Sequence, residues 1–192
     1  TSGQVRKLAE KWFGPIPSGK IAPPGWLQEP VQMEKRILTT SARVPSNALY
    51  KGYHMPGRIQ AGYHASDLAT DILGRGNSSR LYQTLVRDQE IFTNISAYIL
   101  GSIDPGMLMF SGRVAGNRSP EEAEKYLDEV VQRFVQDGPT DEEMEKVRNQ
   151  TETGQKFSEV EIMNRAFNLA YASMLGDPNL INTEWEDVRR VT

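Results

Sequence analysis

The segment from Gly74 to Glu90, GRGNSSRLYQTLVRDQE, combines glycines, small polar residues and two arginines, so it could hold a phosphate or a peptide. A P-loop has the pattern G-x-x-x-x-G-K-[ST] after a strand, and a dinucleotide fingerprint has G-x-G-x-x-G. This segment follows a predicted helix, lacks the lysine, and has Ser79 where the third glycine belongs. We therefore interpret its glycines and serines as a turn between two helices, not as a nucleotide site.

Arg87 is the side chain of this segment that is best suited to bind a substrate. A helix that begins near Ser79 would place its leucines on one face and Arg80 and Arg87, seven residues apart, on another. One hypothesis makes Arg87 a surface charge paired with an acidic neighbour such as Asp88. The other makes it a grip for peptide carbonyls or a carboxylate, because a guanidinium presents a planar fork of donors.

The residue types present give little support for a metal site or a catalytic nucleophile. The chain has two histidines, His54 on a predicted strand and His64 near a predicted helix start, and neither fits the spacing H-x-x-E-H. GNSSR lacks the second glycine of a G-x-S-x-G nucleophile elbow, and cysteine is absent, which excludes thiol catalysis, disulfides and cysteine-bound metals. We predict no catalytic residue and no metal site within this chain.

Acidic residues cluster at 121–122 and 141–145, each cluster directly after a capping residue, Ser119 or Thr140. Both capping residues are followed three positions later by Glu, the pattern of a capping box. Negative charge in the first turn of a helix is favoured by the positive end of the helix dipole. We interpret these carboxylates as helix-start residues exposed to solvent and not as a catalytic pair.

Composition indicates a folded domain with a real core: 192 residues, 38% hydrophobic and 24% charged. The net charge of -3 gives no basic surplus, so we expect no nucleic-acid partner. No apolar run approaches the roughly 20 residues of a membrane span. The chain begins with TSGQVRKLAEKWFG, inside a helical pattern and without a signal peptide, which suggests a fragment of a longer protein.

The first 30 residues are expected to form a terminal helix and a proline-rich interdomain linker. Residues 4–13 have helical spacing of apolar residues, and residues 14–30 hold three glycines and five prolines, a composition typical of an extended linker. Residues 31–192 are then expected to form one further domain.

Residues 31–192 alternate between strand-like and helix-like patterns. In chain order the expected elements are strands at 36–44 and 48–55, helices at 63–73 and 79–90, strands at 93–100 and 106–114, and helices at 119–134 and 140–175. The helix at 140–175 is expected to be interrupted near Gly154, and a short helix is expected to follow it from about Thr183. The order β-β-α-α-β-β-α-α with short turns predicts an α+β two-layer sandwich, mostly antiparallel, with helices packed on one face.

Several motifs resemble one known family when they are taken in order. GRGNSSRLYQTLVRDQE is similar to the G-x-S-S-R-L-Y-x-x-L-R-E segment of pitrilysin/insulinase-type zinc peptidases, the group that includes the mitochondrial processing peptidase. WFGPIPSGK, GYHMPGR, ILGRG, GPTDEEMEKVRNQ and LAYASMLGDPNLIN resemble further segments of that family. The likeness runs from about residue 10 to the C-terminus, and it is to the second, C-terminal domain of a tandem pair.

The resemblance implies a non-catalytic role. In this family the first domain carries H-x-x-E-H, with two histidines on zinc and the glutamate as general base. This chain has no such motif, so it should bind no zinc and be inactive alone, and zinc is implied for the parent protein. The implied partners are a peptide substrate and an N-terminal catalytic domain, of the same chain or of a homologous subunit, with which this domain closes a chamber.

The resemblance also implies two peptide-binding positions. Arg87 stands at the family's arginine, and Asn94 stands seven residues later, where the family usually has tyrosine. Tyr98 shares a strand face with Asn94 but lies roughly 13 Å away at about 3.3 Å per residue. Asn94 could still bond a peptide carbonyl.

The missing tyrosine favours an alternative in which the parent is a catalytically inactive partner or scaffold subunit of the same family. A third hypothesis is an unrelated α+β binding domain. A periplasmic or secreted parent is compatible with the sequence, which does not fix the compartment.

Overall fold

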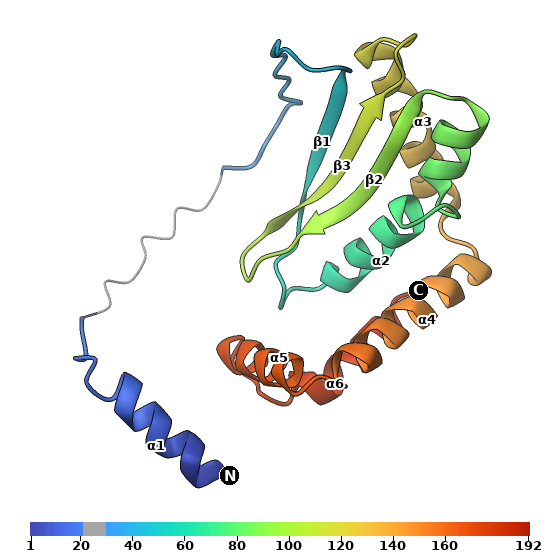
Figure 1. Ribbon diagram of the computed structural model, residues 1–192. Helices are drawn as coiled ribbons and strands as arrows, with labels where there is room; N and C mark the ends of the chain where they lie inside the picture. Colours follow the sequence, from blue (N-terminus) through green and yellow to red (C-terminus); the bar gives the residue numbers. More distant parts are fainter. Residues whose placement is uncertain (21–29) are drawn as a thin grey trace. The chain divides into compact units, whose positions relative to one another are not determined.

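The computed structural model describes residues 1–20 and 30–192, and the chain divides into two compact units, Thr1–Ala42 and Arg43–Thr192 (Figure 1). Residues 21–29, which belong to the predicted linker, lie outside the described residues. The predicted domain boundary at residue 30 stays a prediction.

The first unit contains one helix, α1 (Ser2–Phe13), which agrees with the helix predicted at 4–13. Thr1 and Gln4 form a capping box at its start, and the helix ends at Gly14 before Pro15. No residue of α1 is buried.

The strand predicted at 36–44 is wrong. Residues 36–42 are exposed and adopt no regular structure, and the same holds for Arg43 and Val44. A strand needs a hydrogen-bonded neighbour, and the strand expected to pair with this segment pairs elsewhere in the sheet. The β-rich composition of RILTTSARV could not reveal the missing neighbour.

The second unit is built on a three-stranded antiparallel sheet, β1 (Ala48–Met55), β2 (Phe92–Leu100) and β3 (Gly106–Val114), in the order β1-β3-β2. The bounds of β1 and β3 are those predicted, and β2 begins one residue earlier. The α+β class with an antiparallel sheet is confirmed, but the described residues hold three strands where four were expected.

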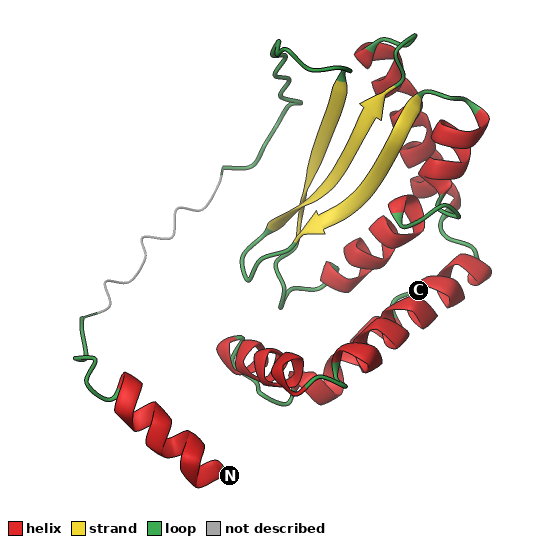
Figure 2. Ribbon diagram, viewed as in Figure 1, coloured by secondary structure: helices red, strands yellow, loops and turns green. Residues whose placement is uncertain are grey.

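Helices pack on one face of this sheet (Figure 2). On that covered face Ile95, Ala97 and Phe110 are buried and join the main core. We name the other side the open face. Strand alternation and the pairing register assign to it Ala48, Tyr50, Gly52 and His54 of β1, Asn94, Ser96, Tyr98 and Leu100 of β2, and Met107, Met109, Ser111 and Arg113 of β3.

Three helical segments cover the sheet: α2 (Tyr63–Gly74), the π-helix η1 (Tyr82–Asp88) and α3 (Pro120–Asp137). The start of α3 follows its predicted chemistry, because Ser119 Oγ accepts a hydrogen bond from the Glu122 N–H at 3.1 Å. Leucines from all three segments enter the core beneath the sheet.

The predicted long helix at 140–175 is two helices, α4 (Asp141–Ser158) and α5 (Ile162–Met174), so the break comes after Gly154 and not at it. Ser158 Oγ donates to the Gln155 carbonyl at 2.8 Å, which gives the last turn of α4 a local partner. The final helix, α6 (Leu180–Arg190), begins before the predicted Thr183, and it joins α2 and α4 in a second core around Leu68, Met144 and Val188.

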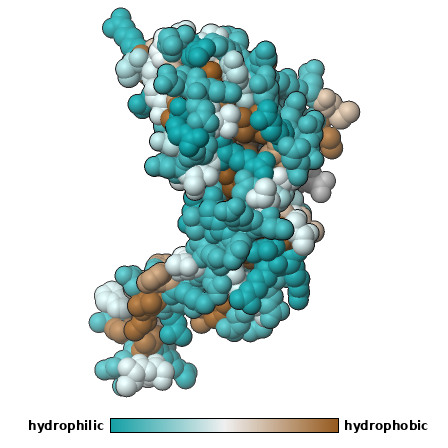
Figure 3. Space-filling view, turned by 90° about the vertical axis from the view of Figure 1, so that its right-hand side faces the viewer, coloured by the Kyte–Doolittle hydropathy of each residue, from teal (hydrophilic) through white to brown (hydrophobic). Residues whose placement is uncertain are grey.

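Within residues 1–20 and 30–192 no helix is both long and apolar enough to cross a membrane. The face of the molecule drawn in Figure 3 is largely hydrophilic.

Candidate functional site

Arg87 lies in the last turn of η1, where the backbone winds more widely than in an α-helix. The Gln89 N–H donates to the Thr84 carbonyl at 3.1 Å, and the Ile91 N–H donates to the Leu85 carbonyl at 2.8 Å. Leu85 is completely buried, and it anchors this wide turn to the core. Such π-turns occur frequently at functional sites, because they change the direction in which a helix presents its last side chains.

The guanidinium of Arg87 is exposed and pairs with its neighbour. Its Nε donates to Asp88 Oδ1 at 2.7 Å, and this hydrogen bond raises the pKa of Arg87 and lowers the pKa of Asp88. The side chains of Arg87 and Asp88 are 58% and 54% exposed, so water weakens the pair. The two Nη groups bond no described residue, which leaves a fork of donors open to a ligand.

Asn94 lies on the open face, at the start of the regular pairing between β2 and β3. A β-bulge between Phe92 and Asn94 leaves Thr93 unpaired, so that Phe92 enters the core while Asn94 faces the opposite side. Asn94 is exposed and lies directly opposite Arg113 of β3. Tyr98 shares this face, as predicted, opposite Met109.

Arg113 was missed in the sequence reasoning. Its side chain is exposed, and among the described residues its guanidinium makes no ion pair. The β2–β3 turn was predicted, and the register that such a short turn implies could have placed Arg113 beside Asn94.

The structure does not bring Arg87 and Asn94 into contact. Among the described residues, the hydrogen-bond partner of Arg87 is Asp88, and the strand neighbour of Asn94 is Arg113. This bears out the pairing hypothesis for Arg87 and leaves its role toward a substrate as a prediction.

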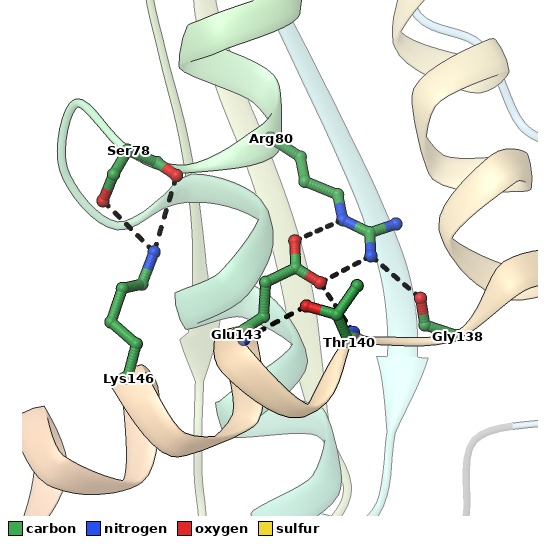
Figure 4. Close-up of polar contacts among 6 residues, drawn as sticks. All are labelled: Ser78, Arg80, Gly138, Thr140, Glu143 and Lys146. Carbon is green, nitrogen blue, oxygen red and sulfur yellow. Dashed lines mark hydrogen bonds and ion pairs between the residues drawn. The ribbon is translucent and has the colours of Figure 1, made fainter.

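Arg80 has a structural role (Figure 4). It forms a two-point pair with Glu143, at 2.6 Å from Nε and from Nη2, and Nη2 also donates to the Gly138 carbonyl at 2.9 Å. The guanidinium lies 5.0 Å from the centre of the Phe134 ring. Arg80 therefore ties the segment after the glycine turn to the α3–α4 connection.

Glu143 is the centre of this arrangement. Its hydrogen bonds to Arg80 are the main reason that its pKa falls to about 2, and it also accepts from the Thr140 N–H as half of a capping box. Lys146, one turn later, donates to the hydroxyl and carbonyl of Ser78. The GRGNSS turn is thus held by α4, which supports the interpretation as a structural turn.

The histidines do not fit a zinc site. His64 Nε2 lies 3.7 Å from Glu184 Oε1, but Arg58 pairs with the same carboxylate, and burial lowers the pKa of His64. His54 lies on the open face, away from any second histidine in the sheet. Within the described ranges, no three His, Cys, Asp or Glu side chains gather as metal ligands would.

A protein-family model described as "Peptidase M16 inactive domain" matches residues 1–151. No curated protein matches the chain. Several solved structures have the same fold at low sequence identity to this chain.

The inactive peptidase domain of a proposed zinc protease from Bordetella parapertussis is 22% identical, with a TM-score of 0.69, over 80% of this chain and 84% of that one. A proposed zinc protease from Bordetella pertussis Tohama I is 23% identical, with a TM-score of 0.67, over 76% and 80% of the two chains. A protease from Helicobacter pylori is 17% identical with a TM-score of 0.85, and this chain, matched over 100% of its length, spans 47% of it.

Proposed function

This chain belongs to the peptidase M16 inactive-domain family, and we propose that it closes the chamber of a zinc metalloendopeptidase and binds peptide there for a zinc site in an N-terminal domain outside this chain. The resemblance to the C-terminal domain of pitrilysin/insulinase-type peptidases is confirmed by the family match. The activity of the whole protein, its zinc and its peptide substrate belong to the proposal.

The observation that carries peptide binding is the free donor fork of Arg87. Its Nη groups have no partner among the described residues, and its position at the end of η1 is fixed by the buried Leu85. A guanidinium held in this way can donate two parallel hydrogen bonds to a peptide carbonyl or carboxylate. The side-chain amide of Asn94 adds an NH2 donor group and a carbonyl acceptor, which suits the C=O and N–H of a peptide backbone.

Zinc has no place in the mechanism of this chain itself. His54 and His64 lie in separate environments, and the carboxylate nearest His64 is already paired with Arg58. Zinc bound elsewhere would activate the water that attacks the peptide. The residues of this chain would orient the substrate, and orientation alone can contribute a large share of a rate enhancement.

The test is an Arg87→Ala variant of the full-length protein, with Arg133→Ala as the control. Arg133 is an exposed arginine of α3 and lies away from the open face. We expect kcat/KM for an unfolded peptide to fall about tenfold with Arg87→Ala, which corresponds to about 1.4 kcal/mol of lost transition-state binding, and to stay unchanged with Arg133→Ala. Equal kinetics for both variants would remove Arg87 from the mechanism.

Asn94 favours a second candidate function, that of an inactive partner subunit. The tyrosine that the resemblance leads one to expect is replaced by a shorter side chain, and Tyr98 cannot substitute because it pairs four residues further along β3, opposite Met109. A parent protein without H-x-x-E-H and without peptidase activity would establish this candidate. In that case the chain would bind peptide for a catalytic partner.

A further inference from the structure

The open face of the sheet carries large apolar side chains that no helix covers. Tyr50 is 68% exposed and Leu100 is 53% exposed, and Tyr98 and Met107 are each more than a third exposed. Contiguous apolar surface of this kind marks interaction sites more often than it occurs by chance. On the covered face Ile95, Ala97 and Phe110 lie in the core, and Tyr53, at 41% exposed, is the exception among its large apolar side chains.

Gly52 lets two methionines lie across the middle of this face. A Cβ atom at position 52 would come within 2.5 Å of Met107 Cε and 2.9 Å of Met109 Sδ, so both thioether side chains occupy the space above the glycine. Methionine is flexible and polarisable, and surfaces rich in it adapt to apolar partners of different shape. This favours binding of varied apolar side chains over one fixed ligand.

The charged side chains of the strands are of one sign, positive. The three strands contain no acidic residue. Their Lys51 points to the covered face, where it bonds Glu124 and Asp128 of α3. Arg113 remains as an exposed cation at one end of the open face, without an ion-pair partner among the described residues, so it is complementary to a carboxylate.

The dimensions suit an extended peptide. From Met107 to Arg113 is six residues along β3, or roughly 20 Å. An extended segment of about seven residues has that length, and its alternate side chains, about 7 Å apart, match the spacing of side chains along the face. Asn94, in the same cross-strand row as Arg113, makes this surface continuous with the candidate site.

We propose that the open face binds an extended peptide segment whose apolar side chains lie on Tyr50, Tyr98 and the two methionines and whose acidic side chain pairs with Arg113. This rests on the proposed function and gives it a substrate class: apolar segments of unfolded chains that carry a nearby Asp or Glu. In this proposal the open face selects the sequence of the bound segment, and the role of Arg87 is tested separately by Arg87→Ala.

The test measures fluorescence anisotropy of labelled, C-terminally amidated peptides titrated with the 192-residue chain. Three peptides of equal length are compared. The first is rich in Leu and Phe and has one Glu near an end, and the second has Gln in place of that Glu. The third is a Gly/Ser peptide. We expect the Glu peptide to bind about five- to tenfold more tightly than the Gln peptide, and the Gly/Ser peptide to bind most weakly. Amidation ensures that the Glu side chain is the source of the carboxylate.

Matched variants locate the binding surface. We expect Tyr50→Ala to weaken binding of the Glu peptide about tenfold, because the loss of an aromatic anchor has an effect of that size. Phe157→Ala removes a ring on α4 that is 73% exposed, and it should leave binding unchanged. Arg113→Gln should abolish the preference for Glu over Gln, and Arg133→Gln should preserve it. Because Tyr50 and Arg113 are both exposed, neither change should unfold the chain, which circular dichroism would verify.

The possible failures are distinct. Equal binding of all three peptides, unaffected by Tyr50→Ala, would overturn the open-face proposal while peptide binding stood. Binding of none would overturn both the open-face proposal and peptide binding by this domain. A dimer in sedimentation that Tyr50→Ala dissociates and the Glu peptide leaves intact would assign the face to a second copy of the chain and overturn the proposal.

Discussion

Arg80 and Arg87 lie seven residues apart in the same segment, and their surroundings differ. Arg80 is largely buried in a pair with Glu143, whereas Arg87 is exposed beside Asp88. The expectation that the two arginines share one face assumed an α-helix, and the wider turns of η1 break that spacing. The partner of Arg80 lies 63 residues away, so no local pattern could reveal it.

The Arg80–Glu143 pair gives a prediction for stability against pH. Its hydrogen bonds lower the pKa of Glu143 from 4.5 to about 2, so the unfolded state takes up the proton first as the solution is acidified. The contribution of the pair to the free energy of unfolding is therefore complete above about pH 4.5 and is lost as the pH falls toward 2. We expect Arg80→Leu to cost about 2 kcal/mol at pH 7, as charge-assisted hydrogen bonds do.

Urea unfolding of the wild type and of Arg80→Leu between pH 7 and pH 2.5 checks this. The difference between the two proteins should shrink steadily below pH 4.5. A difference that stays constant with pH would assign the effect of Arg80 to its packing on Phe134 and not to the ion pair.

At the scale of elements, most of the architecture could be predicted and the exceptions have physical causes. The strands at 48–55 and 106–114 were predicted to the residue, because turn residues bound them on both sides. The strand at 36–44 failed because composition does not specify a partner. The bulge before Asn94 and the π-turns of η1 depend on how β2 and η1 fit the core, which local pattern does not encode.

The close contact between α2 and β2 predicts that alanine will have opposite effects on stability at two glycines. A Cβ on Gly74 would lie 2.0 Å from the Ala97 nitrogen, so Gly74→Ala must separate the helix from the strand. A Cβ on Gly154, inside α4, would meet nothing within 4 Å. We expect Gly74→Ala to destabilise the chain by about 2 kcal/mol or more, and Gly154→Ala to stabilise it by about 0.5–1 kcal/mol.

Thermal unfolding of Gly74→Ala and Gly154→Ala shows whether close packing or helix propensity governs the change in stability. Opposite shifts in Tm are expected. If both variants shift Tm in the same direction, then helix propensity, and not the close approach of Gly74 to Ala97, governs the effect.

At the scale of the whole molecule, the two units differ in how much they bury. Every described residue of 1–42 is exposed, whereas the second unit contains both hydrophobic cores. The sequence predicted a terminal helix and linker before a folded domain, and the exposure of this unit is compatible with that prediction. How a companion domain would use the exposed residues of α1 could not be predicted, because its surface is not encoded in this chain.

Removing residues 1–42 should therefore leave the folded unit intact. We expect the truncated chain to have the same Tm as the 192-residue chain within about 2 °C, since none of the described residues at 1–20 and 30–42 is buried. Differential scanning calorimetry of both chains measures this. A fall of about 5 °C or more would show that the first unit stabilises the second.

The location of zinc tests the central claim, that this domain serves a metal site which it does not contain. The measurement is the zinc content of the full-length protein, purified without added metal, with the 192-residue chain as the blank. We expect about one zinc per full-length chain and none in the 192-residue chain. Zinc in neither would support the inactive-subunit alternative, and stoichiometric zinc in the 192-residue chain would contradict the account.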